Sequence, residues 1–153
     1  SHHIKGQSRT RTTLLPEASD AFVAEDNPIR VIDVSMIIDL LDLGFEAANA
    51  KLTVRPGYHP STMLKLYIYG YLNRIQSSRR LEKENHRNVE LIWLLKRLRF
   101  DVKIIANFSK DNGKGIKNVC RRFVNVAYLI WPPNKKRYAI RIARLSAKNG
   151  KRA

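Results

Sequence analysis

The segment PSTMLKLYIYGYLNRI, which begins at Pro60, constrains the fold of this chain more than any other stretch. Proline at its first position favours a helix start. Apolar and aromatic side chains leave this helix hardly any polar face: Met63, Leu64, Leu66, Tyr67, Ile68, Tyr69, Tyr71, Leu72 and Ile75. A helix that is apolar all round must be covered by other elements, so the segment predicts a helix buried in a protein interior.

Two features of this buried helix refine the prediction. Gly70 costs the helix about 1 kcal/mol relative to alanine, and its presence suggests a close helix crossing. Tyr67, Tyr69 and Tyr71 are predicted to be core and rim residues. Platforms for stacked bases usually lie on exposed sheets, which makes that role for the three tyrosines the weaker interpretation.

A second, densely charged helix is predicted after a break at residues 76–78. A buried helix followed by a capped basic helix is typical of a helix-turn-helix DNA-binding unit. Arg79 and Arg80 lie in its first turn, where their charges oppose the helix dipole unless an anion such as DNA phosphate is bound. Ion pairs with Glu82 and Glu84, three or four positions along the helix, explain the pattern equally well. Both interpretations stay open.

Two short helices are predicted next. Asn88 caps the first, whose end carries cations that the helix dipole favours: Lys96, Arg97 and Arg99. The second covers residues 101–112, with Lys103, Asn107 and Lys110 on its outer face at i, i+4 and i+7. Asparagine can read adenine through two hydrogen bonds, and lysine can contact phosphate or guanine. A solvated lysine face would give the same spacing.

The last part of the chain is predicted to form two basic helices. In the first, Cys120 belongs to an apolar stripe and is predicted to be a core thiol; the opposite face carries Lys117, Arg121 and Arg122. A double proline ends this helix. Beyond it, four cations repeat at i, i+4, i+7 and i+11: Arg137, Arg141, Arg144 and Lys148. Such a face suits contacts along DNA phosphates or, as the second candidate, an anionic membrane surface.

The N-terminal part is predicted to be an arm followed by an acidic helix. Arg9 lies in the basic arm and either follows a phosphate backbone or is solvated. Asn27 and the proline after it give a helix start, and Gly44 is placed to stop that helix. Its aspartates are predicted to solvate the helix and not to form a catalytic cluster: Asp33, Asp39 and Asp42. The predicted division is a flexible arm (1–13), a helical domain (14–131) and a basic tail or helix (132–153).

The net charge of the chain indicates which kind of molecule it binds. Its 153 residues carry a formal net charge of +16, which points to a polyanion and first of all to nucleic acid. Twelve Lys or Arg residues follow Asp111 without any carboxylate. No catalytic residue, metal site or cofactor is predicted, because no phosphate-binding glycine loop, nucleophile elbow or paired metal-ligand spacing is present. One cysteine and the lack of a long apolar span predict a cytoplasmic protein without membrane association.

A long run also carries a family resemblance. The letters RPGYHPSTMLKLYIYGYLNRIQSSRRLEKENHRNVELIWLLKRLRFDVKIIANFSKDNGKGIKNVCRRFV closely resemble the N-terminal domain of bacterial insertion-sequence transposases of the DDE class. IKGQSRTRTTLLPE and AEDNPIRVID look like the same family, so the resemblance extends from Ile4 to Val124. In that family a helical N-terminal domain precedes an RNase H-like domain, whose three carboxylates bind divalent metal and cut and rejoin DNA. The resemblance implies a DNA-end-binding or assembly portion of a transposase.

The chain departs from this family in two places. Ser109 stands where relatives usually have arginine, which removes one possible phosphate contact. From Asn125 onward the sequence does not continue into the family's catalytic domain, and it looks like the product of a truncated or frame-shifted element. The expectation is therefore a chain that cannot transpose DNA unaided, and that competes with intact transposase if it still dimerises.

Together these observations predict a compact all-α domain with a helix-turn-helix-like core and a basic C-terminal helix. Its expected partners are double-stranded DNA at the element ends and, for assembly, intact transposase or a second copy of the chain. The expected location is the bacterial nucleoid. Two alternatives stay open: a structured-RNA-binding protein, which would prefer RNA over duplex DNA at equal salt, and an oligomerisation module, which light scattering would reveal.

Overall fold

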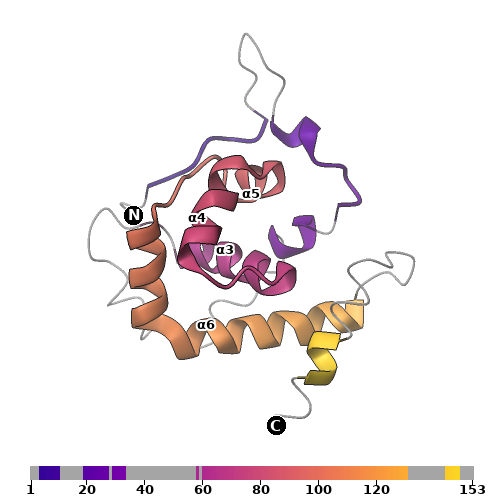
Figure 1. Ribbon diagram of the computed structural model, residues 1–153. Helices are drawn as coiled ribbons and strands as arrows, with labels where there is room; N and C mark the ends of the chain where they lie inside the picture. Colours follow the sequence, from indigo (N-terminus) through magenta and orange to yellow (C-terminus); the bar gives the residue numbers. More distant parts are fainter. Residues whose placement is uncertain are drawn as a thin grey trace.

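The computed structural model describes residues 4–10, 19–27, 29–33, 58, 60–130 and 144–148. Its labelled elements are the 3₁₀ helix η1 (Ser19–Phe22) and the α-helices α3 (Pro60–Asn73), α4 (Ser78–Arg87), α5 (Val89–Leu94) and α6 (Val102–Ile130) (Figure 1). Residues 29–33 and 144–148 are also helical. Within these ranges the only extended pairing is an isolated bridge between Ile4 and Tyr58. The predicted all-α fold is confirmed.

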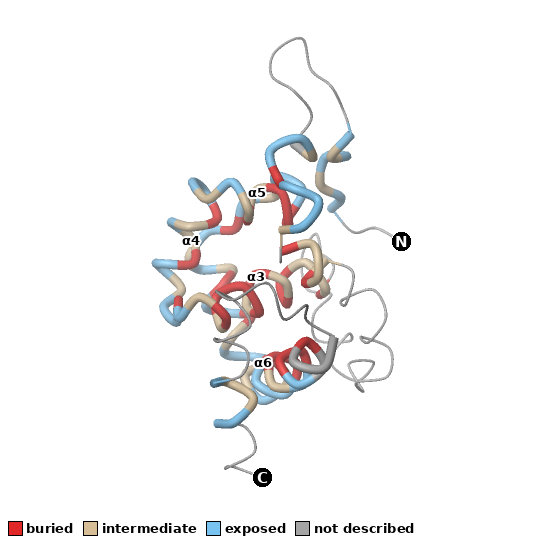
Figure 2. The backbone as a smooth tube through the Cα atoms, turned by 90° about the vertical axis from the view of Figure 1, so that its right-hand side faces the viewer, coloured by how far each residue is buried: buried red, intermediate tan, exposed pale blue. Residues whose placement is uncertain are grey.

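Helix α3 lies at the centre of the molecule, and α4, α5 and α6 all pack against it (Figure 1). Leu64, Leu66 and Ile68 are completely buried, as its apolar sequence predicted. A Cβ atom on Gly70 would lie 2.8 Å from the Leu81 side chain of α4, so the predicted close crossing is confirmed. Figure 2 shows the buried residues of α3 above the buried face of α6.

The tyrosines of α3 belong to the core and its rim, as predicted. Tyr69 is only 5 % exposed, and Tyr71 packs partly buried against the core. Tyr67 stacks on Phe108 of α6 with the ring centroids 5.7 Å apart, and its hydroxyl donates to the backbone oxygen of Ile105. Burial raises the pKa of Tyr67 to about 12. These rings are therefore engaged in packing between helices.

Side-chain caps fix the N-terminal ends of α4 and α5. The hydroxyl of Ser77 accepts a hydrogen bond from the backbone N–H of Arg80. The side chain of Asn88 accepts from the backbone N–H groups of Glu90 and Leu91. Each cap satisfies N–H groups that have no partner inside their own helix. The predicted Asn88 cap is thereby confirmed.

Helix α5 stops before the cations that the sequence places near its end. It ends at Leu94, and the next residues turn into the left-handed region, with φ of 51° at Lys96 and 61° at Arg97. The N–H of Arg97 donates to the Ile92 oxygen and closes this turn, as in common helix C-terminal motifs. Lys96, Arg97 and Arg99 therefore lie just beyond the end of α5, in the loop that follows it.

A buried asparagine of α4 holds the chain between α5 and α6. Asn85 is completely buried. Its amide nitrogen donates to the Leu98 oxygen at 3.0 Å, and its amide oxygen accepts from the Phe100 N–H at 2.7 Å. These bonds replace helical ones, which explains why the helix does not continue to Arg99.

Helix α6 joins two helices that the sequence predicted as separate. The expected break occurs at Asn112, whose φ of −130° and ψ of 21° are not helical, but the chain continues in a new direction without an intervening loop. We call residues 102–111 the first limb and residues 113–130 the second limb (Figure 1). The apolar stripe of the second limb is buried, as predicted: Ile116, Val119, Cys120, Phe123, Val124 and Ala127.

The N-terminal segment, residues 4–10, packs across the end of α5. The N–H of Gln7 donates to the Lys96 oxygen at 2.9 Å. A Cβ atom on Gly6 would lie 2.4 Å from the Lys96 Cβ atom, so only glycine permits this approach. Residues 29–33 form the predicted helix start, because the Asn27 side chain accepts from the Ile29 N–H at 3.0 Å.

Arg9 fixes the N-terminal segment through a cluster of largely buried charges. Its guanidinium lies 4.0 Å from the ring centroid of Trp93, donates to the Trp93 oxygen and makes two hydrogen bonds with Asp33, at 2.8 and 2.9 Å. The ammonium of Lys65 lies 2.7 Å from the same carboxylate. The predictions of a solvated or phosphate-bound Arg9 and of a solvating Asp33 were therefore wrong, because each residue is paired inside the protein.

Several predictions for the N-terminal and C-terminal parts stay predictions. Asp39, Asp42 and the helix end at Gly44 lie outside the described residues. The division of the chain at residues 13 and 131 stays a prediction, as does the helix-turn-helix assignment of α3 and α4.

Candidate nucleic-acid interface

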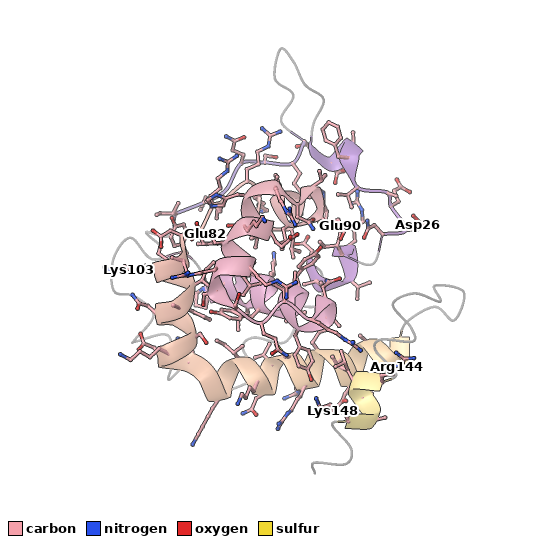
Figure 3. All side chains as sticks on the ribbon, in the orientation of Figure 1. Asp26, Glu82, Glu90, Lys103, Arg144 and Lys148 are labelled. Atoms are coloured by element: carbon pink, nitrogen blue, oxygen red, sulfur yellow. The ribbon has the colours of Figure 1, made fainter. Side chains whose placement is uncertain are left out.

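The largest set of predicted DNA-binding residues lies on the second limb of α6 and on residues 144–148. Lys114, Lys117 and Arg122 are exposed on the side opposite the buried stripe, and Arg121 is half-buried. The Ser146 hydroxyl lies 3.4 Å from the Asn125 amide oxygen, which places residues 144–148 against the end of α6. We call the cations of this region the second-limb surface: Lys114, Lys117, Arg121, Arg122, Arg144 and Lys148 (Figure 3).

The second-limb surface has one sign of charge. Among the described residues, Lys114, Lys117, Arg122, Arg144 and Lys148 make no ion pair. The sequence contains no carboxylate after Asp111 that could neutralise them. Like charges held together on one surface raise the local positive potential and attract anions.

The predicted base-reading residues lie on the first limb of α6. Lys103, Asn107 and Lys110 are all exposed, whereas Ile105 and Phe108 between them are buried. The predicted division of this limb into an inner and an outer face is therefore confirmed. The kink at Asn112 turns the two limbs in different directions, so the exposed groups of the first limb do not continue the row of the second limb (Figures 1 and 3).

Arg79 and Arg80 lie exposed in the first turn of α4. The ion pairs offered as an alternative explanation are absent from the described part of the chain. Glu82 instead accepts a hydrogen bond from the backbone N–H of Val102 at the start of α6. Glu84 pairs with Arg87. The ion-pair interpretation of Arg79 and Arg80 was therefore wrong.

The bond between Glu82 and Val102 also determines what lies near Arg79. It joins α4 to the N-terminus of α6, and Figure 3 shows Glu82 and Lys103 at this junction. Arg79 lies one turn before Glu82 in α4, and Lys103 one residue after Val102 in α6. This junction brings together one cation from each of two predicted sets. Arg137 and Arg141, the remaining predicted DNA-binding residues, lie outside the described part of the chain.

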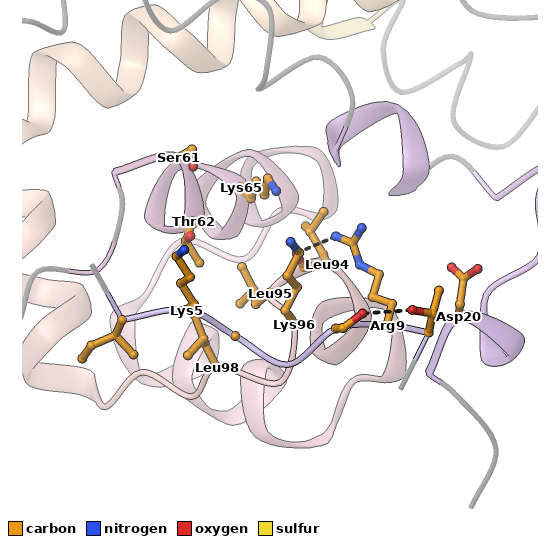
Figure 4. Close-up of a pocket in the computed structure, with 14 residues that line it drawn as sticks. Lys5, Arg9, Asp20, Ser61, Thr62, Lys65, Leu94, Leu95, Lys96 and Leu98 are labelled. Carbon is orange, nitrogen blue, oxygen red and sulfur yellow. Dashed lines mark hydrogen bonds between the residues drawn. The ribbon is translucent and has the colours of Figure 1, made fainter. Parts of the chain in front are cut away.

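The structure adds a cationic cavity that the sequence did not predict. It measures about 990 Å³ and lies between the N-terminal segment, the start of α3 and the loop after α5 (Figure 4). Four cationic side chains line it: Lys5, Arg9, Lys65 and Lys96. No sequence signal identifies it, because its three walls come from distant segments that meet only after folding.

The described residues offer little for covalent or metal chemistry. They contain no group of three His, Cys, Asp or Glu side chains that could hold a metal ion. Cys120 is 4 % exposed, and burial raises its pKa to about 12, which is unfavourable for a nucleophilic thiolate. No described helix has the length and apolar character that a membrane crossing requires.

Comparison with known proteins identifies the family. No curated protein and no solved structure matches the chain. The family described as transposase domain (DUF772) matches residues 17–111, which is more than half of the 153 residues. This family match confirms the expected resemblance to a transposase. The assignment to the DDE class and the truncation stay predictions. The chain belongs to the DUF772 transposase domain family.

Proposed function

We propose that this transposase domain binds double-stranded DNA through the second-limb surface and holds the ends of its mobile element. The observation that carries the proposal is a group of six cations on the second limb and on the segment that contacts its end, from a part of the sequence without carboxylates. Cationic side chains that displace counterions from DNA supply most sequence-independent affinity. Membership of a transposase family makes DNA the expected polyanion.

The dimensions of the second limb fit this role. Its 18 residues span about 27 Å, which corresponds to about eight base pairs of duplex. A helix of this length lies along a groove or a backbone and places its cations against several phosphates. Residues 144–148 lie beside the end of this helix and add two cations to it.

Base reading is assigned to the first limb. Asn107 lies between Lys103 and Lys110 on the exposed face, so one amide that can pair with adenine is flanked by two cations that can hold the backbone. Arg79 and Arg80 would contact phosphates at the junction between α4 and α6. The cleavage and joining steps of transposition are not assigned to any described residue.

Binding measured against salt concentration tests the backbone contacts. If all six cations contact phosphate, the logarithm of the affinity should fall by about 5 per tenfold increase in salt. Lys117→Gln combined with Arg122→Gln should lower that slope by about 2. Arg87→Gln is the matched control, because Arg87 is exposed but already paired with Glu84, and it should leave the slope unchanged. Equal slopes for both variants would contradict the proposal.

Specificity needs a separate experiment. The purified chain is mixed with fragments of its host's genome at moderate salt, and the bound fragments are sequenced. Enrichment of inverted repeats that flank an insertion sequence supports end recognition, and Asn107→Ala should weaken the preference at one base pair only. Uniform recovery would contradict end recognition. Tighter binding to duplex RNA than to duplex DNA at equal salt would contradict the choice of DNA.

A further inference from the structure

The cavity between the N-terminal segment and α3 gathers cations from three separate parts of the chain. We call it the N-terminal groove; its lining includes Lys5 and Arg9 of the N-terminal segment, Lys65 of α3 and Lys96 of the loop after α5. Figure 4 shows Lys96 beside Arg9, and Lys5 extending toward Thr62 at the start of α3. Hydroxyl groups of Ser8, Thr10, Ser61 and Thr62 also line the groove.

The carboxylates near the groove do not balance these charges. Asp33 is shared by Arg9 and Lys65. Asp20 lines the groove, but it accepts a hydrogen bond from the Trp93 ring and pairs with Arg30. Within the described residues, Lys5 and Lys96 have no carboxylate partner. The groove therefore keeps an excess of positive charge beside hydroxyl donors, which is the chemistry that binds phosphate.

The backbone at Lys96 determines which substitution best tests its side chain. Lys96 and Arg97 both have positive φ, which L-residues adopt at a cost and which glycine adopts freely. Glycine is the usual residue where a helix ends in this way, and this chain carries two successive cations there. Lys96→Gly therefore removes the side-chain charge without adding backbone strain.

The cations also continue beyond the groove. Arg97 and Arg99 are exposed on the same loop as Lys96 but do not line the cavity. A single small anion would contact only the groove, whereas a polymer of phosphates would contact the loop as well. A polyanionic strand therefore fits this surface better than a free phosphate does.

The N-terminal groove and the second-limb surface lie at opposite ends of the molecule. The N-terminal segment runs along the top and the second limb along the bottom in two views at right angles (Figures 1 and 2). The central helix α3 and the helices packed on it lie between them. One DNA segment therefore cannot follow the second limb and also enter the groove without bending around the protein.

We propose that the N-terminal groove binds the sugar–phosphate backbone of a second DNA segment, so that one chain holds two duplexes at once. This inference rests on the proposed function, because it takes the second-limb surface as the first DNA site. Lys5 and Lys96 contact phosphates inside the groove, and Arg97 and Arg99 contact the same backbone outside it. The Arg9–Asp33–Lys65 cluster fixes the wall on which Lys5 is carried.

A bridging assay tests the proposal. A duplex is fixed to beads, the chain is added, and retention of a second, fluorescent duplex of the same sequence is measured together with the affinity for one duplex in solution. The wild-type chain should retain the fluorescent duplex. Lys5→Gln combined with Lys96→Gly should reduce retention by about fivefold or more, as the loss of two phosphate contacts predicts. Its affinity for a single duplex should stay within about twofold, because the second-limb surface is intact.

The controls separate this role from folding, total charge and self-association. Arg74→Gly is the matched control, because Arg74 is also an exposed cation with positive φ (58°) but does not line the groove; it should bridge like the wild type. Thermal unfolding should show that Lys96→Gly is no less stable than the wild type, since glycine relieves the positive φ. Light scattering records the number of chains in each complex.

Four results would overturn the proposal. The first is a wild-type chain that binds one duplex but retains no second duplex, which leaves the proposed function intact. The second is unchanged bridging by the Lys5 and Lys96 variant, which would mean that two copies bridge through their second limbs. The third is an equal loss with Arg74→Gly, which would reflect total charge. The fourth is a chain that binds no duplex at all, which would overturn the proposed function as well.

Discussion

Replacing Asp33 by asparagine should destabilise the protein strongly, although Asp33 lies outside every predicted binding surface. The Asp33 carboxylate makes hydrogen bonds with Arg9 and Lys65 at 2.7 to 2.9 Å. The side-chain exposures of the three residues are 15, 16 and 12 %. Asp33→Asn keeps the shape but leaves two largely buried cations without their shared counter-charge.

The size of this effect follows from that burial. Removing one partner of a buried ion pair costs 3–5 kcal/mol, whereas an exposed pair contributes about 0–1 kcal/mol. Because the cluster of Asp33 keeps some contact with water, we expect the lower end, about 3 kcal/mol. For a chain of this length, that loss corresponds to a fall in Tm of roughly 6–12 °C.

Thermal unfolding at neutral pH, followed by circular dichroism, measures the effect of Asp33→Asn. Arg87→Gln is the control, because it removes the exposed pair between Arg87 and Glu84 and should change stability by less than about 0.5 kcal/mol. Equal Tm values for the two variants would refute the reasoning, since Arg9 and Lys65 would then not depend on Asp33 in solution.

The dependence of stability on acidic pH tests the Arg9–Asp33–Lys65 cluster independently. Burial acts to raise the pKa of Asp33, but the hydrogen bonds from Arg9 and Lys65 outweigh burial, so the pKa lies below its ordinary value of 3.8. A carboxylate with a lowered pKa stabilises the fold fully above its unfolded-state pKa and loses this contribution as the pH falls through the folded-state pKa. The wild type should therefore lose more stability than Asp33→Asn when the pH is lowered through and below 4, and parallel losses would contradict the assignment.

Three further predictions concern other parts of the core. Asn85→Ala leaves two backbone groups between α5 and α6 without partners and should cost about 3 kcal/mol in urea unfolding; a loss below about 1 kcal/mol would contradict that account. Gly70→Ala should destabilise by about 1–3 kcal/mol, because its Cβ would lie 2.8 Å from the Leu81 side chain, and a gain of about 1 kcal/mol would show that helix propensity dominates instead. Cys120, buried and with its pKa raised to about 12, should react with iodoacetamide on the order of 100-fold more slowly in the native protein than in urea, and equal rates would argue against its burial.

The repeating patterns of single helices were predicted correctly from the sequence. The apolar residues of α3 and the stripe on the second limb of α6 are buried as their spacing indicated. The caps at Asn27 and Asn88 were found because a capping side chain and the N–H groups it binds are only two or three residues apart. Patterns of this kind depend on the geometry of one helix and on no other part of the chain.

The errors fall where two elements meet. Helix α5 stops before Arg99, which the sequence did not reveal, because Asn85, on another helix, binds the chain at Leu98 and Phe100. The interpretation that Arg79 pairs with Glu82 was wrong because Glu82 caps α6 instead. A sequence pattern cannot reveal a competing partner that lies on a different element.

The sequence alone thus determines three features of this protein: the buried apolar helix, the amphipathic basic helix and the excess of positive charge. Helical spacing and net charge follow directly from the order and number of the residues. Only the tertiary structure determined two other features. One is the ion pair between Arg9 and Asp33, which are 24 residues apart, and the other is the cationic groove under the N-terminal segment. Such contacts depend on which distant segments are brought within a few ångströms of each other. That choice depends on the free energy of the whole packed core.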